Sequence, residues 1–366
     1  MKIAQLAPLA ESVPPKLYGG TERIVSYLTE ELVRQGHDVT LFATGDSQTN
    51  ARLKPMCREG LRKANGVSNP QAPFTMMLEK AFASADQFDV IHSHLDFLTF
   101  PLARRCGTPV LTTLHGRLDL PELKPIFAEF MDCPLISISH AQQQPLAWAS
   151  WQQTIYHGLP ENLYTFHPSS SDHPSSSEDL YLLFVGRLTP EKRPDLAIEI
   201  AKRAGVPLKI AAKVDPVDQK YFHTVIQPLL SDPLIEYVGE ITDAEKNELI
   251  GNAYALLAPF DWPEPFGLVF IEALACGTPI LALRRGSVPE LIDDGQTGFV
   301  CDTGDQMVKA VPRISSLNRS HCRHVFETRF TVGRMVQDYL SAYEALANSQ
   351  DYQSEMSAGS VTAVNF

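Results

Sequence analysis

A chain of 366 residues exceeds the usual size of one domain, about 100–200 residues, so two domains are expected. Hydrophobic residues make up 44% and charged residues 20% of the chain, which is typical of globular proteins and excludes a disordered or fibrous class. A formal net charge of −12 disfavours nucleic acid as the main partner, and no apolar run approaches the ~18 residues of a transmembrane helix.

The start of the chain and its cysteines indicate the compartment. The segment MKIAQLAPLAESVPP reaches Glu11 after a short alternating stretch, so it predicts a first strand rather than a signal peptide. The six cysteines are scattered without a CxxC pair, which favours reduced thiols over a zinc site or a disulfide frame. We therefore expect a cytoplasmic protein.

The first half of the chain alternates short apolar runs with amphipathic segments. Residues 21–34 place Ile24, Leu28 and Leu32 at helical spacing. The strands predicted in this half are KIAQLAP, DVTLFAT, FDVIHSH, PVLTTLH and PLISIS. Strands that alternate with helices indicate a parallel sheet with helical crossovers.

The Ser- and Pro-rich segment HPSSSDHPSSSED, residues 167–179, interrupts this pattern and predicts a linker. A second series of strands follows with DLYLLFVG, PLKIAA, LIEYVG, AYALLAP and PILALR. The expected class is therefore α/β, with two doubly wound Rossmann-like domains at residues 1–166 and 180–328. Residues 329–347 predict a C-terminal helix that caps the second domain or crosses back to the first, and residues 348–366 predict a disordered tail.

The stretch PEPFGLVFIEALACGTPILA, residues 263–282, places Glu264 and Glu272 on either side of an apolar run. It follows a predicted strand, and ligands of open parallel sheets bind at the carboxyl ends of the strands. A helix beginning near Gly267 directs Glu272 back towards the loop that carries Glu264, and its first-turn amides favour a negative or hydroxyl-rich group. The alternative places Glu264 at the helix start and Glu272 on a solvated face.

Two further loops carry candidate binding residues. The segment FVGRLTPEKRPDLAIEI places Arg187 and Lys192 between a strand and a helix, where two cations suit a diphosphate. Solvated surface residues are the alternative. The segment KLYGGTER places Gly19 and Gly20 at a helix start, where bare backbone can approach phosphates. A simple tight turn would account for the same two glycines.

Four segments of the chain form a recognisable combination, namely GGTE, VGRLTPEKR, the E-x7-E of residues 263–282 and the later GSVPELIDDGQTGFV. With these motifs the sequence resembles the retaining nucleotide-sugar glycosyltransferases of family 4, the glycosyl transferases group 1. The resemblance extends to about Tyr343 and is stronger in the second half. It implies the GT-B fold, in which two Rossmann-like domains face a cleft. The first domain is then the acceptor-binding domain and the second the nucleotide-sugar-binding domain.

The resemblance also implies roles for single residues. Arg187 and Lys192 match positions that hold the donor diphosphate, Glu272 matches a carboxylate that binds the ribose hydroxyls, and Glu264 matches one beside the donor sugar. The donor-binding set that the resemblance implies is Gly19, Gly20, Arg187, Lys192, Phe266, Gly267, Leu268, Val269 and Glu272. Glu264 and His115 form the implied catalytic pair, since His115 in TTLHG matches a position that faces the reacting sugar and acceptor. A structural hydrogen bond is the alternative role for this histidine.

Two other activities stay open at this point. The segment HSHLDF places His92, His94 and Asp96 at alternate positions, as in the H-x-H-x-D of metallo-β-lactamase-like zinc hydrolases, but Phe97 stands where the next histidine is expected. A GT-B sugar-nucleotide epimerase, or a degenerate transferase that only binds, is the second alternative.

The expected ligands follow from the resemblance. A nucleotide sugar is the donor, and a small molecule, a glycan or a lipid-linked sugar is the acceptor. Neither a cofactor nor a metal ion is expected, because DTGD and DPVD have the wrong spacing for a metal-binding DxD motif. Neither nucleic acid nor a transmembrane segment is expected.

Overall fold

The computed structural model describes residues 1–17, 19–62, 69–166 and 180–348. The linker expected at 167–179 lies outside these residues, as does all of the expected tail except Asn348, which ends a helix. The chain forms two compact units.

Unit 1 comprises Met1–Gly158 together with the chain from Val332, and unit 2 comprises Leu159–Thr331. The expected boundary at residue 166 therefore moves to Gly158. The guanidinium of Arg323, in unit 2, donates to the carbonyl oxygens of Glu161 (3.0 Å) and Tyr164 (3.2 Å), and the amide of Leu159 donates to the carbonyl oxygen of Phe330 (2.9 Å). These bonds hold the segment from Leu159 within unit 2.

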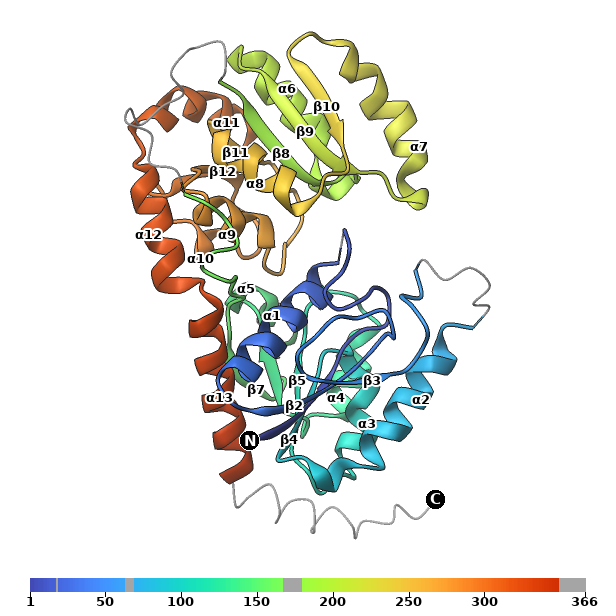
Figure 1. Cartoon of the computed structure of the whole chain (residues 1–366). Helices are drawn as coiled ribbons and strands as arrows, with labels where there is room; N and C mark the ends of the chain where they lie inside the picture. Colours follow the sequence, from blue (N-terminus) through green and yellow to red (C-terminus); the bar gives the residue numbers. More distant parts are fainter. Residues whose placement is uncertain (18, 63–68, 167–179, 349–366) are drawn as a thin grey trace. The chain divides into compact units, whose positions relative to one another are not determined.

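Unit 1 is built on a parallel sheet with the order β3-β2-β1-β4-β5-β6-β7 (Figure 1). Its strands are β1 Lys2–Leu6, β2 Asp38–Ala43, β3 Arg52–Pro55, β4 Val90–Ser93, β5 Val110–Thr113, β6 Leu135–Ser137 and β7 Trp151–Thr154. Its α-helices are α1 Gly20–Arg34, α2 Gln71–Phe82, α3 Phe100–Ala103, α4 Leu123–Glu129, α5 His140–Gln143 and α13 Val332–Asn348. Short 3₁₀ turns lie at η1 Ala85–Gln87, η2 Asp96–Thr99 and η3 Gln144–Leu146.

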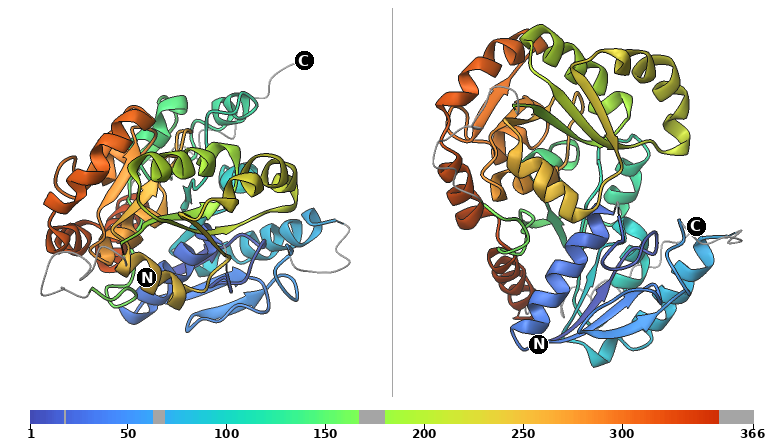
Figure 2. Two further views of the ribbon diagram at one scale, coloured as in Figure 1. Left: turned by 90° about the horizontal axis from the view of Figure 1, so that it is seen from above. Right: turned by 45° about the horizontal axis from the view of Figure 1, so that its top comes forward.

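The C-terminal helix α13 packs in unit 1 beside α1, as the views in Figures 1 and 2 both show. Helix α1 buries Ile24, Leu28 and Leu32, the residues whose helical spacing predicts it. From α13, the rings of Tyr339 and Tyr343 are fully buried. Helix α13 is therefore part of the core of the first unit.

Unit 2 repeats the same plan with the order β10-β9-β8-β11-β12-β13. Its strands are β8 Leu182–Arg187, β9 Leu208–Lys213, β10 Ile235–Gly239, β11 Ala255–Ala258, β12 Ile280–Leu283 and β13 Gly298–Cys301. Its α-helices are α6 Pro194–Ala204, α7 Gln219–Tyr221, α8 Asp243–Asn252, α9 Leu268–Ala275, α10 Val288–Leu291, α11 Gly304–Ala310 and α12 Arg319–Arg329. A π-helical turn, η6 Phe222–Ile226, and the 3₁₀ turns η4 Pro190–Lys192, η5 Pro216–Asp218, η7 Gln227–Ser231 and η8 Val311–Ser316 complete it.

The prediction of two doubly wound α/β units is confirmed. In each sheet the strand order reverses beside the first strand, between β1 and β4 in unit 1 and between β8 and β11 in unit 2. Crevices at the carboxyl ends of strands form at such reversals. The loops that follow β8 and β11 are therefore the places where a ligand of unit 2 is expected.

In the described ranges, none of the helices has both the length and the hydropathy needed to cross a membrane. The sequence pattern does not predict three of the observed strands, β3, β7 and β13. Each of them lies at an edge of its sheet. An edge strand with one bonded neighbour needs less apolar surface than a central strand, which explains the weaker signal of β3 and β7.

Candidate functional site

Glu264 lies in the loop that follows β11, and its side chain is buried. The residue is 8% exposed, so the carboxylate needs a partner inside the protein. Lys192, at the end of η4, forms an ion pair with Oε2, and the indole Nε1 of Trp262 donates to the same oxygen at 3.0 Å. Oε1 has no hydrogen bond or ion pair to any residue of the described ranges.

The GSVPE segment after β12 fixes the shape of this loop. The amide of Ser287 donates to the carbonyl oxygen of Glu264 at 3.0 Å, and its hydroxyl donates to that of Phe266 at 2.6 Å. Gly286 has φ of 51°, and a Cβ there would lie 2.3 Å from the Glu264 carbonyl oxygen. Only glycine fits so close to the loop. The motif therefore holds the backbone that carries Glu264.

Helix α9 begins directly after the loop. Its N-cap residue Gly267 has φ of 85°, and a Cβ there would lie 2.6 Å from the ring of Phe270. Leu268 and Val269 form the first turn, whose amides have no acceptor within the helix. Phe266 is 2% exposed and packs edge-on against Phe330, so its ring belongs to the packing of unit 2.

Glu272 projects from the second turn of α9 and is 4% exposed, so the interpretation as a solvated face is wrong. Lys246, on α8, approaches Oε1 at 2.6 Å and also lies 3.4 Å from Asp243. Oε2 of Glu272 makes no hydrogen bond or ion pair within the described residues. Glu272 thus repeats the arrangement of Glu264, with one oxygen paired to a lysine and the other available.

Arg187 lies at the carboxyl end of β8, and Lys192 lies beyond it, in the turn that follows. Arg187 ends the strand and forms an ion pair with Asp215 at 3.5 Å. Lys192 lies over the ring of Phe260, with its Nζ 4.0 Å from the centroid, and the hydroxyl of Thr189 caps its turn by accepting from the Lys192 amide. Each cation therefore faces an acid of unit 2, rather than standing on an open surface.

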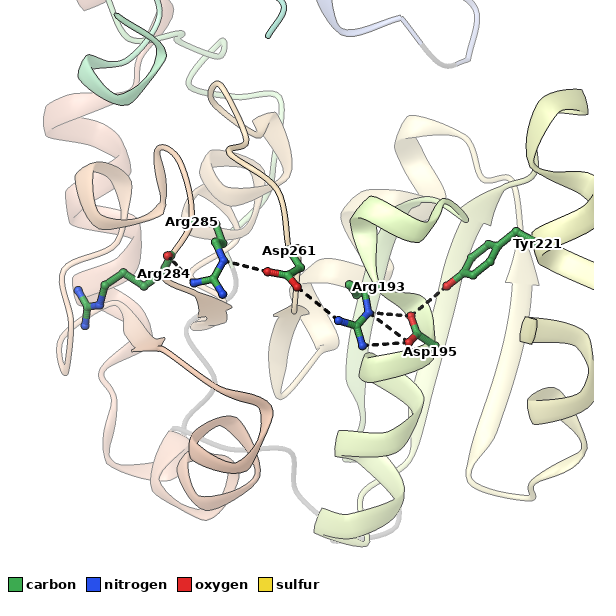
Figure 3. A network of polar contacts seen from close by, with 6 residues as sticks. All are labelled: Arg193, Asp195, Tyr221, Asp261, Arg284 and Arg285. Carbon is green, nitrogen blue, oxygen red and sulfur yellow. Dashed lines mark hydrogen bonds and ion pairs between the residues drawn. The ribbon is translucent and has the colours of Figure 1, made fainter. Parts of the chain in front are cut away.

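A polar network next to these residues ties the turn after β8 to the loop after β11 (Figure 3). Arg193 has φ of 54° and contacts Asp195 through Nε and Nη2 at 3.1 Å. Asp261 accepts from Arg285 at 2.9 Å and reaches Arg193 at 3.5 Å. Tyr221 donates to Asp195 at 2.9 Å, and burial together with this carboxylate raises the pKa of its hydroxyl. The network supports the loops rather than presenting free charge.

In unit 1, Gly20 begins α1 and Gly19 precedes it as the N-cap residue. A Cβ on Gly19 would lie 2.8 Å from Cβ of Pro15, so this turn is closely packed.

His115 follows β5 and is part of a group of four histidines in unit 1. Its Nε2 lies 2.8 Å from Nδ1 of His94, and its ring stacks on that of His157 with a centroid distance of 5.3 Å. Burial lowers the pKa of His115 to about 3, and the pKa values of His92, His94 and His157 lie well below 6.5 for the same main reason. All four rings are neutral at pH 7.

The two histidine rings of the HSHLDF segment are hydrogen-bonded within unit 1. His92 contacts Thr113 and Tyr343, while His94 contacts Gln5 and His115, so both rings have other partners. Throughout the part of the chain that the structure describes, no three His, Cys, Asp or Glu side chains gather in an arrangement that could hold a metal ion. The zinc hydrolase alternative therefore lacks its ligand set.

Comparison with known families agrees with this geometry. The profile of Glycosyl transferases group 1 matches residues 167–326, and that of Glycosyltransferase Family 4 matches residues 18–159. The chain belongs to the family 4, group 1 glycosyltransferases. This confirms the family expected from the GGTE, VGRLTPEKR and PEPFG motifs.

Individual relatives support the same family and fold. D-inositol 3-phosphate glycosyltransferase of Mycolicibacterium smegmatis is 26% identical over 334 residues, which cover 78% of this chain and 76% of that protein. Sucrose-phosphate synthase from Thermosynechococcus elongatus superposes with a TM-score of 0.73 at 18% identity, covering 94% and 98% of the two chains. Anabaena HepE, in complex with UDP and glucose, gives a TM-score of 0.71 at 21% identity and covers 94% and 100%. The GT-B fold of this glycosyltransferase is thereby established.

The sequence interpretation missed three residues of the unit 2 site, namely Lys246, Ser287 and Trp262. Ser287 lies in GSVPELIDDGQTGFV, one of the motifs that carry the family resemblance, and Trp262 lies two residues before Glu264. Their positions in the sequence could therefore have indicated both as site residues. Lys246 carries no such signal, because it lies on another helix and meets Glu272 only in the folded chain.

The four neutral histidines predict a loss of stability in acid. The unfolded chain takes up protons below pH about 6.5, whereas the folded rings do not until much lower pH. The contribution of these histidines to the free energy of unfolding is therefore fully present above pH about 6.5. It decreases as the pH falls towards 3, by about 1.4 kcal/mol per pH unit for each histidine. Urea unfolding of the Trp262→Phe variant, followed by its tryptophan signal, measures the stability of unit 1 at each pH. The tryptophans that remain in this variant, Trp148 and Trp151, both lie in unit 1.

In that background, His115→Asn should shrink the difference in unfolding free energy between pH 7 and pH 5 by about 2 kcal/mol. His324→Asn, which removes an exposed histidine of unit 2, is the matched control and should leave the difference unchanged. An equal difference with and without His115 would contradict the neutral, buried state of this ring.

Proposed function

We propose that this glycosyltransferase moves a sugar from a nucleoside diphosphate to an acceptor hydroxyl, with retention of configuration and without a metal ion. One observation carries the proposal. In unit 2, two buried carboxylates each pair one oxygen with a lysine and keep the other available, beside the loops at which the strand order reverses. Such groups suit hydroxyl-rich ligands, because an ionised carboxylate accepts several hydrogen bonds.

The donor fits these groups in a definite order. Glu272 accepts hydrogen bonds from the ribose hydroxyls through Oε2, while Lys246 orients the carboxylate through Oε1. Arg187 and Lys192 bind the diphosphate, with the first-turn amides of α9 and the backbone of Phe266 and Gly267. Gly19 and Gly20 remain proposed donor contacts through their backbone. The complex of HepE with UDP and glucose supports this class of donor.

The reaction breaks the bond between the anomeric carbon and the diphosphate oxygen. The acceptor oxygen then bonds to the same face of that carbon, and its proton passes to an oxygen of the departing phosphate. Arg187 and Lys192 stabilise the negative charge on the leaving diphosphate, and Glu264 stabilises the positive charge on the sugar. His115 contacts a sugar hydroxyl as a neutral ring.

The first test is binding. Arg187→Ala and Lys192→Ala each remove charge-assisted hydrogen bonds of roughly 1.5–3 kcal/mol, so the affinity for UDP, GDP or ADP should fall by about one to two powers of ten. Titration calorimetry measures this, with Arg284→Ala as the control because it removes an exposed cation paired with Asp302. Equal affinities for the nucleoside diphosphate in the wild type and the three variants would show that neither Arg187 nor Lys192 binds the diphosphate.

The second test separates binding from turnover. Glu264→Gln removes the charge that stabilises the reacting sugar, so kcat should fall by about 10²–10³-fold while the affinity for the nucleoside diphosphate stays near that of the wild type. Glu199→Gln, an exposed carboxylate of α6, serves as the control. Unchanged turnover in Glu264→Gln would remove this residue from the mechanism.

The third test is a donor-by-acceptor screen with UDP-, GDP- and ADP-sugars, run with and without EDTA. NMR of the anomeric proton should show product with the configuration of the donor, at a rate that the chelator leaves unchanged. Loss of the rate in EDTA contradicts the metal-independent route, and an inverted product contradicts retention. An epimerised donor formed without acceptor would instead assign the chain to the epimerases.

A further inference from the structure

The hydrogen bonds around His115 continue as one chain through unit 1. His94 links His115 to Gln5 of β1, since its Nε2 lies 2.8 Å from Oε1 of Gln5. The amide nitrogen of Gln5 donates to the hydroxyl of Tyr343 at 3.3 Å, and that hydroxyl lies 2.7 Å from Nδ1 of His92. The chain thus leads from the end of β5, through β4 and β1, to the C-terminal helix α13.

Counting donors and acceptors shows which group donates in each hydrogen bond of this series. The oxygen of the Gln5 amide only accepts, so Nε2 of His94 carries the proton. Because the ring is neutral, Nδ1 of His94 is the acceptor, and His115 must donate to it from Nε2. His115 is neutral as well, so its Nδ1 carries a lone pair. Nδ1 is buried and has no hydrogen-bond partner among the residues that the structure describes.

The orientation of one amide decides this outcome. If the Gln5 amide were turned over, its nitrogen would donate to His94, and each following bond would reverse. His94 would then donate from Nδ1 to His115, and the outer nitrogen of His115 would carry a proton. In the observed orientation the amide nitrogen of Gln5 donates to the hydroxyl of Tyr343, which leaves the proton of that hydroxyl for Nδ1 of His92.

We propose that Gln5, which is hydrogen-bonded to Tyr343, is a positioning residue that sets the tautomer of His115 through His94, so that the ring presents Nδ1 as a bare hydrogen-bond acceptor. The chemical role of this acceptor rests on the proposed function, in which a sugar hydroxyl donates to it. Gln5 is fully buried and acts only through His94. A neutral acceptor orients the hydroxyl without competing for its proton, in keeping with the low pKa of the ring.

The test reads the tautomers directly in the unliganded full-length protein. Long-range ¹H–¹⁵N spectra of ¹⁵N-histidine-labelled protein distinguish a protonated Nε2 from a protonated Nδ1, and His94→Asn and His115→Asn assign the two signals. Both rings should carry the proton on Nε2 in the wild type. A His115 ring protonated on Nδ1 would overturn the proposal.

Two variants at Gln5 separate positioning from packing. Gln5→Met keeps the size but removes the acceptor, so the tautomers of His94 and His115 should become mixed and kcat should fall about three- to tenfold. Gln5→Glu still only accepts from His94, so it should retain Nε2–H on both rings and most of kcat. Thr29→Val, a buried change in α1 outside this chain of hydrogen bonds, is the control for general destabilisation.

The outcomes also separate this proposal from the proposed function. If Gln5→Met leaves both tautomers unchanged, Gln5 does not set them, whatever the activity. If His94 and His115 lose the Nε2–H tautomer in Gln5→Glu, the donors and acceptors assigned to this series of hydrogen bonds are wrong. If the tautomers respond as expected but no donor and acceptor pair is turned over by the wild type, the positioning role stands and the proposed transferase reaction fails.

Discussion

The ion pair between Lys192 and Glu264 is the interaction on which the unit 2 site depends. A buried carboxylate without a charged partner would be strongly destabilising, and the charged partner comes from the turn after β8 rather than from its own loop. The pairing therefore fixes two loops at once. Ser287 and Gly286 hold the backbone of the same loop from the other side, so the position of the carboxylate and the path of the chain are set together.

The unit 2 site and the histidine group of unit 1 handle buried polar groups by different physical means. Unit 2 keeps charges inside and balances each acid with a lysine, as in the pairs of Glu264 and Glu272. In the histidine group of unit 1, charge is excluded. Its four rings are neutral because burial disfavours the imidazolium form, and hydrogen bonds satisfy most of their nitrogens.

The sequence predicted what is local and missed what depends on contacts across the fold. The central strands and the PEPFG loop carry apolar runs, glycines and prolines that restrict the backbone locally, so their places were found. Edge strands such as β3 and β7 have no buried residue and give no such pattern. Lys246 meets Glu272 from a different helix, and the unit boundary at Gly158 depends on Arg323, far along the chain. Neither contact leaves a periodic trace in the sequence.

The return of the chain to unit 1 at Val332 has a consequence for biosynthesis. A ribosome completes the first 158 residues well before it adds α13, so Gln5 and His92 leave the exit tunnel long before Tyr339 and Tyr343 exist. Domains generally fold in order of synthesis, yet here the first must wait until the second has been made. Until α13 has been made, the amide nitrogen of Gln5 and Nδ1 of His92 lack their partner Tyr343, so these contacts of β1 and β4 form only after unit 2 has been synthesised.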